Sequence, residues 1–117
     1  MVIVQKIHEE LNFLKQMLRN LGFFLVGSTT KSIEDILHEE FIEEIFGVYM
    51  GNNNNNDRVG SCTIINAFNG TIIEITLNLN ALTIHNAKVK QLLLLGFKEH
   101  IRDDLNYNWL EYRVEIK

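Results

Sequence analysis

The sequence predicts a two-layer α+β domain in which three helices cover one face of a mostly antiparallel sheet of about five or six strands. Three stretches lead to this prediction: a helical apolar pattern near the N-terminus, a hairpin signal at Asn69-Gly70, and an alternating pattern from Tyr107 to Lys117. The predicted order of elements is α-β-α-β-β-β-α-β-β. A chain of 117 residues has the size of one domain, so we expect residues 1–117 to fold as a single unit.

The first predicted helix covers residues 3 to 21. Its apolar side chains recur at intervals of three and four residues, which places them on one helical stripe. Gly22 follows the stripe and suits the left-handed residue that often ends a helix. Phe13 and Met17 extend the apolar surface beyond the stripe. The stripe itself consists of Val4, Ile7, Leu11, Leu14, Leu18 and Leu21.

A short apolar strand (residues 23–26) and a turn (27–31) precede the second predicted helix, Ile33 to Phe46. Ser32 is the expected N-cap, because its hydroxyl can accept a backbone hydrogen bond at the start of the helix. Gly47 is predicted to follow the helix, and residues 48–50 to form a strand. The run Asn52 to Asn56 is predicted to be a flexible tract, since it offers no side chain that could anchor a core.

The central hairpin is organised around Asn69-Gly70, a dipeptide that tolerates the positive φ angles of a two-residue type I′ turn. With these residues at the turn centre, Phe68 faces Thr71 and Ile64 lies opposite Ile75. One hairpin face is then mostly apolar and should be buried, while the other should be solvated. The apolar face holds Cys62, Ile64, Ile73, Ile75 and Leu77; the polar face holds Val59, Ser61, Thr63, Ile65, Ala67, Ile72, Glu74, Thr76 and Asn78.

The rest of the chain is predicted to form a third helix that ends at Leu95, followed by Gly96 and by two strands, residues 97–102 and 107–117. In the last strand two sets of side chains alternate, which is typical of a strand with one buried face. The first set is Leu110, Tyr112, Val114 and Ile116, and the second is Trp109, Glu111, Arg113 and Glu115.

Composition narrows the class of protein. No run of about 18 apolar residues exists, so we expect no transmembrane helix. The N-terminus lacks the basic start and unbroken apolar segment of a signal peptide, and we expect a cytoplasmic protein. The single cysteine, Cys62, rules out an internal disulfide and a cysteine metal cluster, and its place on the apolar hairpin face predicts a buried residue.

The charge distribution argues against nucleic-acid and membrane partners. The formal net charge is -4, and residues 1–50 hold eight acidic and four basic side chains. Phosphate contacts need a basic footprint, which this acidic half does not supply. A protein partner with a basic surface fits the charge better.

The sequence feature that most resembles a metal site is a histidine close to carboxylates on one predicted helix. Glu34, Asp35 and His38 fall within one turn of the second predicted helix and could supply two ligands. The same pattern arises by chance on a solvated acidic helix, which is the interpretation we favour. No zinc signature, phosphate-binding loop or nucleophile motif is present, and the GSTTKS run at Gly27–Ser32 is explained as a turn and an N-cap. We therefore predict no catalytic, cofactor-binding or metal-binding residues.

The tail from His85 to Lys117 resembles the end of N-acetyltransferases of the GNAT superfamily, in which a helix closing with Gly-Phe is followed by two strands. The resemblance implies acyltransferase-like ancestry. The coenzyme A site of that family is a glycine-rich turn after a strand. Here the corresponding residues are Asn80-Ala81-Leu82-Thr83, without glycine or arginine, so we expect no coenzyme A binding. The element order is also similar to that of secretion-chaperone-type α+β proteins.

We therefore expect a small non-enzymatic protein–protein interaction protein, such as an adaptor, a chaperone-like protein or an inhibitor. It should self-associate as a homodimer, because the apolar surface of three helices exceeds what one sheet face covers. The alternative is a degenerate GNAT-like enzyme or a small-ligand-binding module. The candidate interaction surface consists of Glu39, Glu40, Glu43, Glu44, Tyr107 and Trp109.

Overall fold

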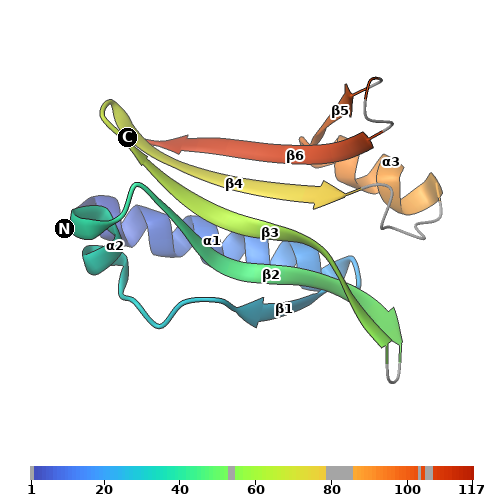
Figure 1. The fold of residues 1–117 in the computed structure, drawn as a ribbon, viewed down its shortest axis with the longest axis horizontal. Helices are drawn as coiled ribbons and strands as arrows, with labels where there is room; N and C mark the ends of the chain where they lie inside the picture. Colours follow the sequence, from blue (N-terminus) through green and yellow to red (C-terminus); the bar gives the residue numbers. More distant parts are fainter. Residues whose placement is uncertain (1, 53–54, 79–85, 103, 105–106) are drawn as a thin grey trace.

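The computed structural model describes residues 2–52, 55–78, 86–102, 104 and 107–117. Within this part of the chain, three helices and six strands follow the predicted order, which confirms the α+β fold (Figure 1). The helices are α1 (Val2–Asn20), α2 (Ile33–Glu39) and α3 (Asn86–Leu94). The strands are β1 (Phe24–Gly27), β2 (Ile42–Asn52), β3 (Asn55–Ala67), β4 (Gly70–Asn78), β5 (Lys98–Arg102) and β6 (Tyr107–Ile116).

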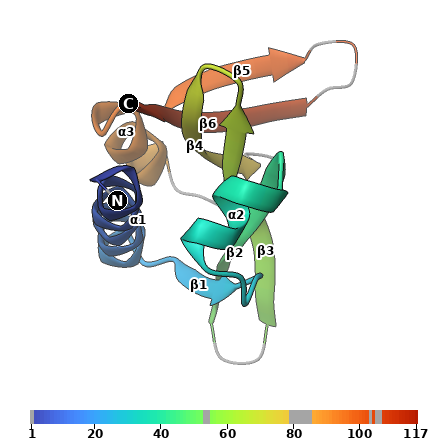
Figure 2. The same ribbon diagram turned by 90° about the vertical axis from the view of Figure 1, so that its left-hand side faces the viewer.

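The six strands form one antiparallel sheet in the order β1-β2-β3-β4-β6-β5. The helices α1 and α3 lie on the same side of this sheet, with α3 near the C-terminal end of α1, and α2 lies near the opposite end of the sheet (Figures 1 and 2). We call the helix side of the sheet the inner face. Its buried side chains include Phe46, Cys62, Ile64, Ile73, Ile75, Leu77, Leu110 and Ile116.

The apolar stripe of α1 packs onto the inner face. Ile7, Leu14 and Leu18 are fully buried, whereas Phe13 on the flank of the stripe is 57% exposed. Burial of each of these large side chains contributes roughly 1.5–3 kcal/mol relative to leaving it in water. The stripe therefore belongs to the core of a single chain.

The β3–β4 hairpin has the predicted faces but not the predicted register. Ala67 pairs with Gly70 and Ile64 with Ile73, so the two-residue loop is Phe68-Asn69. The pairing differs by two residues from the one expected, and a shift of two leaves every side chain on its predicted face. The new register lets Asn66 hold α2 in place, because its backbone N–H donates to Phe41 O (2.7 Å) and its side-chain Nδ2 to Leu37 O (2.6 Å).

Val59 is the exception to the predicted faces, since it is buried and not solvated. The β2–β3 register shifts between the pairs Val48–Gly60 and Tyr49–Arg58, which leaves Val59 as an extra residue on β3. Such a bulge interrupts the alternation of side chains along a strand. A second shift, between the pairs involving Glu44 and Phe46, makes Ile45 the extra residue on β2.

The prediction that the second helix runs to Phe46 is wrong, because α2 ends at Glu39 and β2 begins at Ile42. The start of the helix is as predicted: the Ser32 hydroxyl accepts a hydrogen bond from the Asp35 N–H at 3.2 Å. The run from Phe41 to Val48 is rich in aromatic and β-branched residues, which favour a strand when a partner strand is available. Strands β1 and β3 supply those partners.

Two of the three glycines that we expected to follow helices do so with positive φ: Gly22 at 93° and Gly96 at 109°. Gly47 lies inside β2, so the prediction for this residue is wrong. A Cβ at residue 47 would meet the Tyr49 ring at 2.9 Å, so glycine is needed there for close approach of an aromatic side chain.

The asparagine tract forms the end of the β2–β3 hairpin, where Asn52 pairs with Asn55 and Gly51 with Asn56. Three of the five asparagines are therefore strand residues, and that the tract is flexible stays a prediction. Residues 53–54 lie outside the described residues. So do residues 79–85, which include the four residues compared with the coenzyme A turn.

Candidate functional site

The face of the sheet opposite the helices, which we call the outer face, brings apolar, charged and aromatic side chains together on one surface. The strand register arranges its side chains in rows that cross the sheet. The first row is Ile42, Ile65, Ile72 and Glu115; the second is Glu44, Thr63, Glu74 and Arg113; the third is Gly47, Ser61, Thr76, Glu111 and Lys98. Beyond the third row, Tyr49 lies on β2, and Asn78, Trp109 and His100 follow one another on β4, β6 and β5.

The outer face exposes apolar side chains at one of its edges. Phe24, Val26 and Ile42 are each slightly more than half exposed, at 52%, 54% and 53%. Ile65 and Ile72 form a pair near the centre and are partly buried. Phe24 and Val26 lie together on β1, and Ile42 lies further along, at the start of β2. Groups of exposed apolar side chains commonly mark interaction sites.

A charged cluster lies on the β4–β6–β5 half of the outer face. Arg113 Nη1 lies 3.3 Å from Glu74 Oε2 and 3.7 Å from Glu111 Oε1. The other carboxylate oxygen of Glu111 lies 3.1 Å from His100 Nε2. Lys98, His100, Glu111 and Arg113, together with Gly96, line a hollow of about 220 Å³.

The pKa of Glu74 is raised above its ordinary value of 4.5, mainly because partial burial removes water from the carboxylate and also because Glu111 is a nearby negative charge. Arg113 and a hydrogen bond from Thr76 oppose this shift. The two carboxylates thus repel each other across β4 and β6, and Arg113 holds them together. Protonation of Glu74 therefore removes one negative charge from the outer face.

The predicted acidic surface is not one helix face. Glu39 is the last residue of α2, and Glu40 caps its end. Glu43 and Glu44 are consecutive residues of β2 and therefore point to opposite sides of the sheet. Lys31 forms ion pairs with Glu40 and Glu43 on the α2 side, whereas Glu44 pairs with Arg58 on the outer face.

Of the two predicted aromatic residues, Trp109 lies on the outer face and stacks on the ring of His100, with ring centroids 5.2 Å apart and an angle of 14° between the planes. Tyr107 is the first residue of β6, and its side chain lies outside the described residues. The structure therefore brings Trp109 and Glu44 onto the same face of the sheet, on different strands, and separates them from Glu39, Glu40 and Glu43.

The other candidates from the sequence have structural roles. The Asp35 backbone N–H is used by the Ser32 cap, and no three His, Cys, Asp or Glu side chains in the described part of the chain lie close enough together to hold a metal ion. Cys62 is fully buried, and burial raises the pKa of its thiol to about 12. At neutral pH this cysteine is protonated and unreactive.

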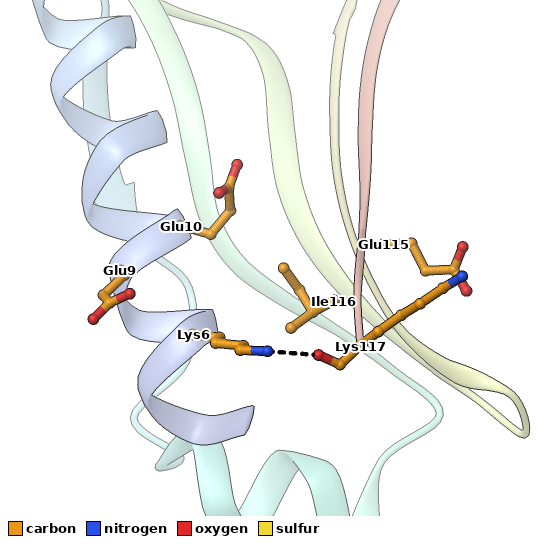
Figure 3. Close-up of a pocket in the computed structure, with 6 residues that line it drawn as sticks. All are labelled: Lys6, Glu9, Glu10, Glu115, Ile116 and Lys117. Atoms are coloured by element: carbon orange, nitrogen blue, oxygen red, sulfur yellow. Dashed lines mark hydrogen bonds between the residues drawn. The ribbon is translucent and has the colours of Figure 1, made fainter. Parts of the chain in front are cut away.

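A second hollow, of about 360 Å³, lies on the helix side between α1 and the end of β6 (Figure 3). Lys6, Glu9, Glu10, Glu115, Ile116 and Lys117 line it. The Lys6 ammonium donates a hydrogen bond of 2.9 Å to the main-chain oxygen of Lys117, which ties α1 to β6. Glu9 and Glu115 point away from each other in Figure 3, so the lining carboxylates do not converge on one ligand position.

Sequence reasoning did not identify the charged cluster, although it did identify the alternation that places Trp109, Glu111 and Arg113 on one face of β6. The sequence pattern does not show which strands lie on either side of β6. Because β6 lies between β4 and β5, Glu74 and His100 come to either side of Glu111 and Arg113. The order of strands depends on packing across the whole sheet, and it cannot be predicted from the side-chain pattern of one segment.

Comparison of the chain with protein-family models, with curated proteins and with solved structures finds no match. Among the helices that the structure describes, none has the length and the apolar character needed to cross a membrane.

Proposed function

We propose that the protein is a small non-enzymatic interaction protein that forms a homodimer through the outer face of its sheet. The observation that carries this proposal is the exposure of Phe24, Val26 and Ile42 on a face without helices. Water contact with these side chains costs free energy in the monomer, and a second sheet would remove it.

The size of the outer face fits a stable dimer. Six strands about 4.8 Å apart give a width of about 24 Å, and nine residues of strand give a length of about 30 Å. The resulting area is roughly 700 Å², close to the ~800 Å² that each partner buries in an interface of standard size. Two sheets that pack face to face also keep their strands within about 30° of each other, as in a β-sandwich.

The charge pattern of the outer face supports a second copy as the partner. Glu44 on β2 and Arg113 on β6 lie in the same row of the outer face, at equal distances from the centre of the sheet, while β6 also carries Glu111 and Glu115 on this face. A two-fold axis parallel to the strands, at the centre of the sheet, places β2 of one protomer over β6 of its partner and β3 over β4. Glu44 then faces Arg113 of the second copy and Ile65 faces Ile72, while the exposed Ile42 and Val26 face Glu115 and Lys98 of the second copy and are covered by their side chains.

The dimer is tested by light scattering coupled to size-exclusion chromatography. We expect about twice the chain mass of 13.6 kDa. Phe24→Asp, on the outer face, should shift the protein toward the monomer. The matched control is Phe13→Asp, because Phe13 is similarly exposed but lies on α1, and this variant should keep the dimer mass.

A monomer mass for the unmodified protein at high concentration would contradict the proposal, as would a dimer that survives Phe24→Asp and dissociates with Phe13→Asp. Thermal unfolding of each variant checks that it still folds. If Phe24→Asp does not fold, Ile72→Lys tests the same face from its centre.

A further inference from the structure

A groove along the second half of α1, closed by Leu95 just after α3, forms a second surface with a defined chemistry on the helix side of the sheet, and we call it the α1–α3 groove. Its volume is about 330 Å³, and it is lined by Phe13, Gln16, Met17, Asn20, Leu21 and Leu95. Phe13 is 57% exposed and Leu95 42% exposed, and the neighbouring Leu94 is 87% exposed. The groove therefore has an apolar floor that the described residues leave open to solvent.

The floor has the length of two helical turns. Phe13, Met17 and Leu21 follow one another at intervals of four residues, so they extend over about 12 Å along α1. An amphipathic helix presents anchors at positions i, i+3 or i+4 and i+7, which cover a similar distance. Gln16 and Asn20 on the rim hydrogen-bond to each other at 2.9 Å, and neither carries a charge.

The end of the groove next to α3 is basic. No acidic residue occurs between Glu10 and Glu34 or between Glu74 and Glu99, and these two segments contain the second half of α1 and all of α3. The cation that the structure places near the groove is Lys88 of α3, whereas Lys15 and Arg19 lie on the other flank of α1, where the Lys15 ammonium lies over the Phe46 ring. The Lys88 ammonium lies 5.3 Å from the centre of the Phe23 ring, just past Leu21, so a cation stands at one end of the groove.

The opposite end of the groove is acidic, which gives the site a direction. Glu10 lies one turn before Phe13 on α1. The pKa of Tyr112 on β6 is raised mainly by burial and also by the negative charge of Glu10. A bound anionic group is therefore favoured at the Lys88 end and disfavoured at the Glu10 end.

We propose that the α1–α3 groove binds an amphipathic helix of a partner protein, with apolar anchors on Phe13, Met17, Leu21 and Leu95 and with acidic residues placed toward Lys88. Charge complementarity is the reason for choosing an acidic helix as the occupant. The groove lies on the opposite side of the sheet from the outer face, so this binding is independent of the proposed dimer. A dimer that binds no such helix would leave the proposed function intact.

The probe is a fluorescein-labelled synthetic peptide designed as an amphipathic helix, with leucines at i, i+4 and i+7 and glutamates on the flanks. Fluorescence polarisation with the full chain should show saturable binding that weakens as salt rises, because the ionic part of the attraction is screened. A peptide with lysines in place of the glutamates, and one with glutamines in place of the leucines, should each bind at least about tenfold more weakly.

Variants of the protein locate the binding. Phe13→Asp and Lys88→Glu should each weaken the acidic peptide by about tenfold or more, whereas Phe24→Asp, the matched control on the outer face, should leave its affinity unchanged. Leu95→Gln tests the same groove if Phe13→Asp does not fold. Circular dichroism of each variant confirms the fold.

Four results would overturn the proposal. They are no saturable binding of the acidic peptide, equal binding of the lysine peptide, and loss of the dimer mass in Phe13→Asp, which would make a second copy the occupant. The fourth is sedimentation with vesicles of phosphatidylcholine and phosphatidylserine that Phe13→Asp abolishes, which would make an anionic lipid surface the occupant.

Discussion

Two glycines at the ends of helices set backbone angles that other residues rarely adopt. Gly22 and Gly96 have φ of 93° and 109°, and a Cβ at residue 96 would also approach the Tyr112 ring at 3.3 Å. We expect Gly22→Ala and Gly96→Ala each to lower the free energy of unfolding by about 1 kcal/mol or more. Gly27→Ala is the control, since an added Cβ there meets nothing within 4 Å. Urea denaturation measures all three, and an effect of Gly27→Ala equal to the others would contradict this explanation.

The raised pKa of Glu74 has a consequence for stability. A carboxyl group whose pKa is higher in the folded than in the unfolded protein holds its proton more tightly when folded. The contribution of Glu74 to stability is therefore most favourable below its ordinary pKa of 4.5 and is lost as the pH rises through the folded value. Glutamine does not titrate, so the free energy of unfolding of Glu74→Gln should increase relative to that of the unmodified protein as the pH rises through this range. Denaturation at a series of pH values measures the difference.

The cause of the shift can be tested on the same carboxyl group. Glu111→Gln removes the neighbouring negative charge and should lower the pKa of Glu74, whereas Arg113→Gln removes the opposing cation and should raise it further. Titration of the Glu74 side chain by nuclear magnetic resonance gives both values. If neither variant moved the pKa, desolvation alone would account for it.

At the scale of single elements, local pattern predicted what depends on local physics. The stripe of α1, the Ser32 cap and the two faces of the β3–β4 hairpin follow from side-chain periodicity and backbone hydrogen bonding. The end of α2 and the turn at Phe68-Asn69 could not be predicted this way. Both depend on contacts between distant segments, such as Asn66 with Leu37 and Phe41, and the pairing of β2 with β3.

The short α2 should depend on its N-cap. It has only seven residues, and the Ser32 hydroxyl accepts the Asp35 N–H that would otherwise lack a helical partner. We expect Ser32→Ala to lower the free energy of unfolding by about 1 kcal/mol, and Ser32→Asp to keep most of it because aspartate also caps helices. Chemical denaturation compares the two. Equal losses in both variants would mean that the hydroxyl acts through some contact other than the cap.

At the scale of the whole molecule, the candidate surfaces follow from which side of the sheet the helices cover. The buried side chains of the α1 stripe pack onto the inner face, as their helical periodicity predicted. The sequence also indicated a polar hairpin face with Ile65 and Ile72 on it. The charged cluster and the α1–α3 groove were not predicted, because the first needs the position of β6 beside β4 and the second needs the position of α3 beside α1.

The geometry of the proposed dimer gives a test that distinguishes a specific interface from non-specific association. With the two-fold axis parallel to the strands, Glu44 of one protomer faces Arg113 of its partner, while each also has an ion pair in its own chain, with Arg58 and Glu74 respectively. We expect Glu44→Arg alone, and Arg113→Glu alone, to weaken the dimer because like charges then meet across the interface.

The double variant, Glu44→Arg with Arg113→Glu, restores opposite charges between the two protomers but not within either one. It should therefore recover part of the dimer affinity that each single variant loses, which sedimentation equilibrium can measure for all four proteins. Stability of the isolated fold should not recover in the same way, since the pairs with Arg58 and Glu74 stay broken. Strictly additive losses of affinity in the double variant would mean that these two side chains do not meet, and would require a different axis or a different face for the dimer.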